Sequence, residues 1–409
     1  MNTDVARMVD RALDAGEGVL RLAPTWVPRS FLVPGRRLKL APSDVYALGA
    51  HRGGIDERWL GSTTPADNEG APPDEGLSHV VGPEERFTLR DAVAAAGDRI
   101  IGRGLMETYG GWTVFAKFFD NLGPIPHHLH QRAHHAKQVG REPKPEAYYF
   151  PPQLNLMRNR FPYTFFGLEP GTTRADVRRC LERWEQGDNG ILDLSRAYTL
   201  TPGTGWLVQA GILHAPGSLV TYEPQWASDV AAMFQSMVED RPVPWRLLVK
   251  DVPEERHHDL DYLVDLIDWD ATVDPHFKVH HYLEPVPVEP RQDGAEDRWV
   301  AYGRVDGRPL LAARELSVRP GARAVLRDAA ASCVVAVQGR GALGALPVET
   351  PGMIRFGEMT ADEFFITEQA AREGVAVRNI GSEPLVLLRY FGPEAITGVP
   401  DVRGEWETR

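Results

Sequence analysis

The sequence contains few cysteines and no long apolar run. Only Cys180 and Cys333 occur in 409 residues, so a disulfide framework is excluded, and two free thiols are typical of a reducing compartment. No stretch approaches the roughly 18 to 20 consecutive apolar residues that a membrane-spanning helix needs. Acidic and basic residues alternate through the N-terminal segment, which is not the pattern of a signal peptide. We therefore expect a cytoplasmic protein without a membrane span.

Positive charge is also scarce. The chain has 45 Lys and Arg against 57 Asp and Glu, a formal net charge of −12 at pH 7. This balance leaves no basic excess to neutralise phosphates, which argues against a nucleic-acid partner. Histidine is unevenly distributed, because none of the 13 lies after His281. A centre built from several histidines can therefore form only in the part of the chain before that position.

Turn-forming residues and short apolar segments are abundant. The 33 prolines and 39 glycines separate short runs of β-branched and aromatic residues, which is typical of a mainly β protein. Helical periodicity is confined to short stretches, at residues 5–22, 88–96, 173–186 and 255–270. Four segments are predicted: an N-terminal helical and irregular segment (1–110), a metal-binding barrel (111–240), a helical connector (241–281) and a second, metal-free barrel (282–409).

The stretch from Phe118 to Phe150 carries the residues most suited to a metal site. His128 and His130 follow a turn rich in Pro and Gly, and residues two apart in a strand point to the same side. Glu146 opens a later strand, and His214 follows in a further one. Imidazole and carboxylate ligands with an open position suit a divalent transition metal. We predict that these four side chains, His128, His130, Glu146 and His214, hold one such ion.

Strand alternation places two more polar side chains on the face of Glu146. Lys144 and Tyr148 lie two residues before and after it, and Lys117 lies in the preceding strand. A buried lysine beside a metal loses its proton more easily because of desolvation and the like charge, and can then shuttle protons. We predict Lys144 as the catalytic group and Lys117 and Tyr148 as substrate-binding residues. The alternative for Lys144 is ion pairing with an acid at the barrel rim, for Lys117 it is a solvated surface position, and for Tyr148 it is core packing.

Seven segments form an ordered set of motifs over residues 55–285. They are ERWLGSTTPADN (57–68), LRDAVAAAGDRIIG (89–102), WTVFAKFFDNLGPIPHHLH (112–130), KPEAYYF (144–150), VQAGILHA (208–215), YEPQWASDV (222–230) and DYLVDLIDWD (261–270). In this order they resemble the class I mannose-6-phosphate isomerases, a family of the cupin superfamily. The resemblance implies a bicupin, a mainly β fold with two β-barrel or jelly-roll domains and added α-helices.

The resemblance also implies a cofactor and a substrate class. It implies metal ligands at His128, His130, Glu146 and His214, with Lys144 lining the pocket. The expected cofactor is one divalent transition metal, zinc first, with manganese, iron or nickel as alternatives. The expected partner is a small-molecule substrate, a sugar or a sugar phosphate.

Two positions depart from the family pattern. His128 stands where the family usually carries glutamine, which gives the three-His, one-Glu set of other cupins. Met233 stands near the place of a family arginine that serves the active site, so an unphosphorylated sugar stays open as the substrate. We predict a metal-dependent aldose–ketose isomerase that moves a proton between C1 and C2 through an enediol. The alternatives are an iron-dependent cupin oxygenase and a sugar-binding bicupin without turnover, and the oligomeric state stays open.

Overall fold

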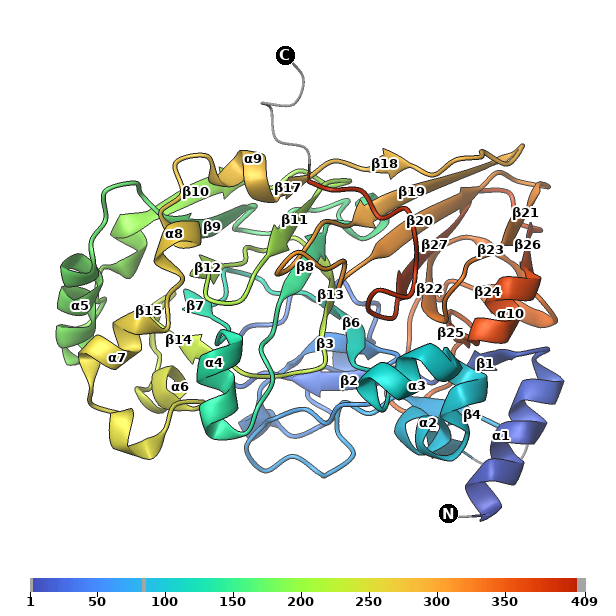
Figure 1. Ribbon diagram of the computed structural model, residues 1–409, viewed down its shortest axis with the longest axis horizontal. Coiled ribbons are helices and arrows are strands. Elements are labelled where there is room, and N and C mark those ends of the chain that lie inside the picture. The colour runs from blue at the N-terminus through green and yellow to red at the C-terminus, as the bar shows by residue number, and fades with distance from the viewer. Residues whose placement is uncertain (1–2, 83–85, 403–409) are drawn as a thin grey trace.

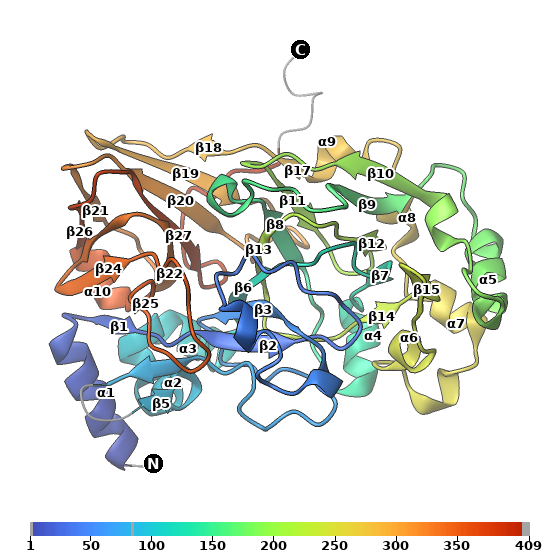
Figure 2. The same ribbon diagram turned by 180° about the vertical axis from the view of Figure 1, so that it is seen from behind.

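The computed structural model describes residues 3–82 and 86–402 (Figures 1 and 2). The outermost residues of the predicted first and last segments, 1–2 and 403–409, lie outside this description. The chain forms several antiparallel sheets with short helices around them, so the expectation of a mainly β fold is confirmed. Two pairs of facing sheets dominate the molecule, and we call them the first and the second sandwich.

The first sandwich consists of a seven-stranded and a five-stranded sheet. The larger sheet has the order β17–β11–β8–β13–β6–β3–β2, and the smaller has the order β10–β9–β12–β7–β14. The bounds in the larger sheet are Tyr282–Leu283 (β17), Gly205–Val208 (β11), Glu146–Tyr149 (β8), Thr221–Trp226 (β13), Val114–Phe119 (β6), Ile55–Leu60 (β3) and Thr25–Pro28 (β2). In the smaller sheet they are Ser195–Thr199 (β10), Tyr163–Leu168 (β9), His214–Ala215 (β12), His128–Leu129 (β7) and Ala232–Met233 (β14).

The second sandwich consists of a seven-stranded and a four-stranded sheet. Their orders are β1–β25–β22–β27–β20–β19–β18 and β21–β26–β23–β24. The bounds in the larger sheet are Val19–Arg21 (β1), Glu363–Ile366 (β25), Ser332–Gln338 (β22), Leu385–Phe391 (β27), Ala313–Val318 (β20), Ala295–Ala301 (β19) and Val286–Pro287 (β18). In the smaller sheet they are Arg323–Leu326 (β21), Val375–Asn379 (β26), Arg340–Leu343 (β23) and Leu346–Glu349 (β24).

The two sandwiches repeat the same strand order. The run β11–β8–β13–β6–β3 of the first corresponds to β25–β22–β27–β20–β19 of the second. The run β10–β9–β12–β7 corresponds in the same way to β24–β23–β26–β21. Because the matched strands also follow one another in the same chain order, the two sandwiches share one topology over these nine strands.

The two seven-stranded sheets pack back to back and share one hydrophobic core. On β6, Ala116 and Phe118 point into this core, where they join Leu388 and Tyr390 of β27. Since side chains alternate along a strand, the neighbouring Lys117 points the other way, into the first sandwich. The central strands are therefore buried on both faces, and a charged residue on the inner face of β6 or β8 must find its partners inside the sandwich.

Helices cover the two ends of the molecule (Figures 1 and 2). Three of them, α5, α6 and α7, lie at the outer end of the first sandwich, and α1, α2 and α3 lie beside the second. Their bounds, with those of the other α-helices, are Thr3–Ala15 (α1), Leu89–Gly97 (α2), Arg103–Tyr109 (α3), Ala133–Ala136 (α4), Arg174–Glu182 (α5), Arg246–Val249 (α6), Leu260–Asp265 (α7), Trp269–Thr272 (α8), Phe277–His281 (α9) and Glu368–Glu373 (α10). Two short hairpins complete the fold, His79–Val81 (β4) with Arg86–Thr88 (β5) and Met237–Val238 (β15) with Arg241–Pro242 (β16).

The helix expected at residues 255–270 is divided into α7 and α8. Asp259 caps α7 by accepting a hydrogen bond from the backbone N–H of Tyr262, and Asp268 caps α8 in the same way from Ala271. An N-cap residue has extended backbone angles, so the second aspartate interrupts the helix before α8. None of the helices in residues 3–82 and 86–402 is long and apolar enough to cross a bilayer.

The strand pairing crosses the predicted segment boundaries. Strands β2 and β3 lie within 1–110, and β17 begins at residue 282, yet all three complete the larger sheet of the first sandwich. Strand β1, also within 1–110, pairs with β25 of the second sandwich. The division into domains stays a proposal, and the pairing favours a first unit that extends from β2 to β17.

Candidate metal centre

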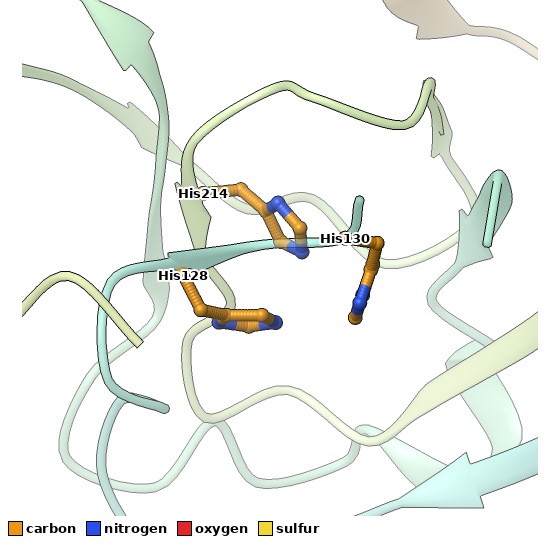
Figure 3. Close-up of side chains that lie close together, drawn as sticks. All are labelled: His128, His130 and His214. Carbon is orange, nitrogen blue, oxygen red and sulfur yellow. The ribbon is translucent and has the colours of Figure 1, made fainter. Parts of the chain in front are cut away.

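Three histidines meet inside the first sandwich (Figure 3). His128 opens β7 and is the antiparallel neighbour of His214 in β12. His130 follows β7 and points to the same side as His128, as the i, i+2 alternation of a strand requires. Their ring centroids are 4.2 Å apart for His128 and His214, and 5.2 Å apart for His128 and His130. The predicted grouping of the three imidazoles is therefore found in the structure.

Each of the three imidazoles is oriented by a backbone carbonyl. A carbonyl oxygen only accepts hydrogen bonds, so the Nδ1 atom beside it must carry the proton, and Nε2 keeps a free lone pair. Ligand nitrogens of all three rings lie within 4.8 Å of one another. A hydrogen bond from Nδ1 to a backbone carbonyl is a means by which proteins fix the tautomer of metal-binding histidines. The Nδ1–O distances are 2.7 Å from His128 to Pro126, 2.6 Å from His130 to Val230 and 2.8 Å from His214 to Ile212.

The carboxylate of Glu146 approaches this group from the opposite sheet. Its Oε2 lies 3.0 Å from Nε2 of His130, and its Oε1 lies 3.1 Å from Nε2 of His214. The Nε2 atom of His214 is buried and has no hydrogen-bond partner. Lone pairs of a neutral imidazole and an anionic oxygen repel each other at this separation unless a cation lies between them. The donor set therefore fits a metal ion, with three imidazole nitrogens and one carboxylate.

The charge states of these ligands suit metal binding. Burial, followed by the charge of His214, lowers the pKa of His128 well below its usual value. Burial and the charge of Lys144 lower the pKa of His130 to about 4. Burial alone raises the pKa of Glu146, but Lys144 and His130 outweigh it and hold that pKa well below the usual range. At neutral pH the imidazoles of His128 and His130 are therefore neutral and the carboxylate of Glu146 is ionised, which are the forms that bind a metal.

Lys144 and Tyr148 both contact Glu146, as their alternation on β8 and its N-terminal extension implies. The Nζ of Lys144 donates to Oε2 of Glu146 at 2.8 Å and lies 3.1 Å from Nε2 of His130. The hydroxyl of Tyr148 donates to Oε1 of Glu146. Among the residues described, Lys144 lines the cavity at this site and Tyr148 lies behind the carboxylate, fully buried.

Lys117 is paired with two glutamates that the sequence analysis did not select. In the register of the larger sheet it lies opposite Glu223 of β13, with Nζ 3.3 Å from Oε1 of Glu223 and 3.2 Å from Oε1 of Glu57 in β3. Glu223 also lies 3.3 Å from Nζ of Lys144. Burial and the charge of Glu146 raise the pKa of Glu223 to about 8. One signal was available, because a single lysine inside the apolar run VFAKFF needs a buried acid on a neighbouring strand.

Arg29 and Asp229 complete the charged surroundings of the site. Arg29 donates to both carboxylate oxygens of Asp229, at 3.2 and 3.0 Å, and to Glu57 at 3.2 Å. The three buried cations are Arg29, Lys117 and Lys144, and the four carboxylates are Glu57, Glu146, Glu223 and Asp229. Because Glu223 is mainly protonated at neutral pH, the three cations balance the three ionised carboxylates, Glu57, Glu146 and Asp229.

A cavity of about 440 Å³ opens onto these groups. Its walls include His128 and His130, the two lysines and Arg29. Met233 of β14 also lines it, beside His128 in the sheet register, and adds an apolar side chain to the wall. His127, adjacent to the ligands, points away, and its Nε2 lies 2.8 Å from the hydroxyl of Ser195. The cavity is large enough for a small-molecule substrate.

Comparisons with known proteins support the fold. No protein-family model and no curated protein matches the chain. Solved structures do match. A mannose 6-phosphate isomerase from Bacillus subtilis has a TM-score of 0.61 and 16% sequence identity, with 91% of this chain and 99% of that chain covered. A phosphomannose isomerase variant from Salmonella typhimurium has a TM-score of 0.58 and 13% identity, with 92% and 99% covered.

A further match is a mannose 6-phosphate isomerase bound with zinc and yttrium. Its TM-score is 0.59 and its identity 13%, with 92% of this chain and 99% of that chain covered. At such identities the likeness shows the fold alone. The chain thus has the cupin-like fold of these isomerases, and the group of His128, His130 and His214 could hold a metal ion in it.

Proposed function

We propose that the protein is a metal-dependent aldose–ketose isomerase acting on a sugar or sugar phosphate. The observation that carries this proposal is the convergence of three Nε2 lone pairs and the Glu146 carboxylate beside a cavity that Lys144 also lines. The fold shared with mannose-6-phosphate isomerases supports the reaction class. Two unpaired, buried cysteines support a cytoplasmic location as part of the same proposal.

The proposed ligands are His128, His130, Glu146 and His214, for one divalent ion, zinc in the first place. Such an ion acts as a Lewis acid that polarises the sugar carbonyl or its neighbouring hydroxyl. The carbonyls of Pro126, Val230 and Ile212 hold the three rings in the ligating tautomer.

Lys144 is the proposed carrier of the proton between C1 and C2. Its ammonium lies against Nε2 of His130 and Oε2 of Glu146, so it shares its acceptors with the metal site. In the amine form the nitrogen of Lys144 would accept the proton from one carbon, and in the ammonium form it would return that proton to the other. Glu223, 3.3 Å from Nζ, is within reach to take up or return that proton.

Lys117 and Tyr148 have supporting roles in this proposal. Lys117 lines the cavity and can donate to a substrate oxygen while Glu57 and Glu223 hold it in position. Tyr148 acts from behind the site, because its hydroxyl fixes the orientation of the Glu146 carboxylate. With Met233 in the wall and Arg29 paired with Asp229, an unphosphorylated sugar stays open as the substrate beside a sugar phosphate.

The donor set also supports a second candidate, an iron-dependent oxygenase. Three imidazoles and one carboxylate suit Fe(II) as well as Zn(II) or Mn(II), because ligand type alone does not select among these ions. An oxygenase consumes O₂ and an isomerase does not. Turnover in the absence of oxygen therefore separates the two.

The test begins with elemental analysis of the wild type, His130→Ala and His134→Ala. His134 is exposed and only four residues from His130, which makes it a matched control. We expect one metal ion per chain in the wild type and in His134→Ala, and none in His130→Ala. Equal metal in all three proteins would contradict the site.

The metal-loaded protein is then assayed anaerobically with mannose, fructose and their 6-phosphates. Interconversion that disappears in His130→Ala supports the isomerase. Oxygen consumption with no anaerobic turnover supports the oxygenase instead. Stoichiometric metal without either activity supports a sugar-binding protein that does not turn over.

A further inference from the structure

The second sandwich has a cavity of its own, of about 740 Å³. Arg314 and Arg389 on the inner face of its larger sheet line this cavity, together with Asp297, Trp299 and Asp328. Both arginines are buried, with 8% and 1% of their surface exposed. Two guanidinium groups this deep inside a sandwich are unusual, because a buried charge is costly unless it serves a partner or a ligand.

The strand register matches this cavity to the metal centre of the first sandwich. Arg314 of β20 lies opposite Arg389 of β27, as Lys117 of β6 lies opposite Glu223 of β13. On the next strand, Trp299 lies opposite Arg314 as Trp59 lies opposite Lys117. The polar groups of both sandwiches therefore occupy the same position in the same fold.

The residues at this position cannot form a metal centre. Strand β22 of the second sandwich corresponds to β8 of the first. Ser332 of β22 lies opposite the last residue of β25, just as Glu146 of β8 lies opposite the last residue of β11. Ser332 thus replaces the carboxylate ligand. The inward-facing residues of β21 and β26 are Ala324, Leu326, Val375 and Val377, where the first sandwich has histidines on β7 and β12.

Arg314 has unused capacity to bind an anion. Its Nη1 donates to Asp328 at 3.0 Å and its guanidinium lies 3.8 Å above the ring of Trp299, but its buried Nε has no hydrogen-bond partner. Burial and the charge of Arg389 lower the pKa of Arg314 to about 10, so its carboxylate neighbours do not fully compensate its charge. An arginine stacked on an aromatic ring presents a planar fork suited to carboxylate or phosphate oxygens.

The charges around the cavity also favour an anion. Arg314 and Arg389 face Asp297 and Asp328, which balance them. Arg291 is paired with Glu289 at the rim. Arg327 adds one more cation to the lining, and its guanidinium donates to the backbone carbonyl of Glu373. The residual charge of the lining is therefore +1, in a protein whose net charge is −12.

We propose that the cavity of the second sandwich binds a small organic anion, with the carboxylate or phosphate oxygens of the ligand held by the guanidinium of Arg314. Val286, Trp299 and Ile396 supply an apolar wall for the rest of the ligand. The proposal does not depend on a metal ion or on the activity of the first sandwich.

The test is calorimetric titration of the full chain with inorganic phosphate and, separately, with succinate. The proteins are the wild type, Arg314→Met and Arg323→Met, the last an exposed arginine on β21 that serves as the matched control. We expect at least one of the two anions to bind at one site per chain. The affinity falls by at least about tenfold in Arg314→Met, because a charge-assisted bidentate contact is lost, and is unchanged in Arg323→Met.

The outcomes decide the proposal. Binding of phosphate alone assigns a phosphate ester as the ligand class, and binding of succinate alone assigns a carboxylate. Failure of both anions to bind the wild type at millimolar concentration overturns the proposal, as does equal affinity in Arg314→Met. Should Arg314→Met fail to fold by circular dichroism, Arg314→Lys keeps the charge and loses the planar fork, and an unchanged affinity in that variant overturns the proposal.

Discussion

Two matched positions in the molecule carry opposite electrostatics. In the first sandwich, Lys117 lies opposite Glu223, and burial alone would lower the pKa of Lys117, but Glu223 and Glu57 raise it above its usual value. In the second, Arg314 lies opposite Arg389, and burial together with that arginine lowers the pKa of Arg314 to about 10. The folded structure therefore stabilises the charged form of Lys117 and destabilises the charged form of Arg314.

The difference indicates that both sandwiches place polar side chains at the same register positions, and that the identity of these inward-facing residues determines which ligand can bind. Three imidazole nitrogens and the carboxylate of Glu146 suit a metal cation in the first sandwich. A residual charge of +1 and an unpartnered guanidinium N–H suit an anion in the second. Since the backbone arrangement is the same, substituting side chains at matched positions tests the contrast directly.

The largest effect is expected on stability, from replacing the two matched cations. Lys117→Met leaves Glu57 and Glu223 buried with fewer cations, so we expect it to cost about 3 to 5 kcal/mol of unfolding free energy. Arg314→Met relieves repulsion from Arg389, which still contacts both aspartates, and should cost at most about 2 kcal/mol. Urea unfolding at pH 7.5 measures both. An equal loss of unfolding free energy in the two variants would contradict the proposed electrostatic difference between the sandwiches.

A smaller effect is expected from pH, because buried histidines occur only in the first part of the chain. His281, 4% exposed, donates from Nδ1 to the carbonyl of Leu207 in β11, and burial lowers its pKa from 6.5 to about 4. Its neutral form is stabilising above pH 6.5, and that stability is lost as pH falls toward 4. From pH 7.5 to 5 the loss is about 2 kcal/mol.

The second sandwich should respond to pH in the opposite direction. Burial raises the pKa of Glu363 in β25 from 4.5 to about 7, so the folded state takes up a proton and gains stability as pH falls from 7 toward 4.5. At pH 5 the backbone amides of the first sandwich should therefore exchange their hydrogens faster than those of the second. In His281→Gln the loss of unfolding free energy between pH 7.5 and 5 should shrink by about 2 kcal/mol, and a full wild-type slope in this variant would rule His281 out as its source.

Much of the candidate metal site followed from local patterns. The i, i+2 spacing of His128 and His130 and the alternation of Lys144, Glu146 and Tyr148 each depend on a single strand, whose geometry is fixed by the backbone. The mainly β fold followed from turn residues in the same way. The structure bears out the convergence of the three histidines, and the roles of the site residues stay proposals.

Features that depend on pairing between distant strands could not be predicted. Glu223 and Lys117 are 106 positions apart in the chain, and only the register of β6 and β13 brings them together. The proline-rich residues 283–298 contain β18 and part of β19, because both strands pair at the edge of the larger sheet of the second sandwich. Nothing in the sequence near Arg314 or Arg389 distinguishes them from other arginines in strands, because only the register of β20 and β27 brings them side by side inside the sandwich.

The smallest effect is expected from two adjacent tyrosines that point to opposite faces of β8. Tyr148 donates its hydroxyl to the proposed ligand Glu146, whereas Tyr149 donates to Oε2 of Glu315 in the second sandwich at 2.8 Å. Tyr148→Phe should weaken zinc binding by about tenfold, or ~1.4 kcal/mol, because the carboxylate loses the contact that orients it. Tyr149→Phe should leave zinc affinity unchanged and lower stability by about 1 to 2 kcal/mol.

Competition with a chelator measures zinc affinity in both variants, and urea unfolding measures their stability. Each variant removes one hydroxyl from a buried tyrosine of the same strand, so their difference isolates the face to which that hydroxyl points. Equal loss of zinc affinity in both would mean that general loosening of β8, and not the contact with Glu146, weakens the site. Loss confined to Tyr148→Phe would tie the metal centre to the inner face of the first sandwich and leave the Tyr149 hydroxyl, with its partner Glu315, to hold the two sandwiches together.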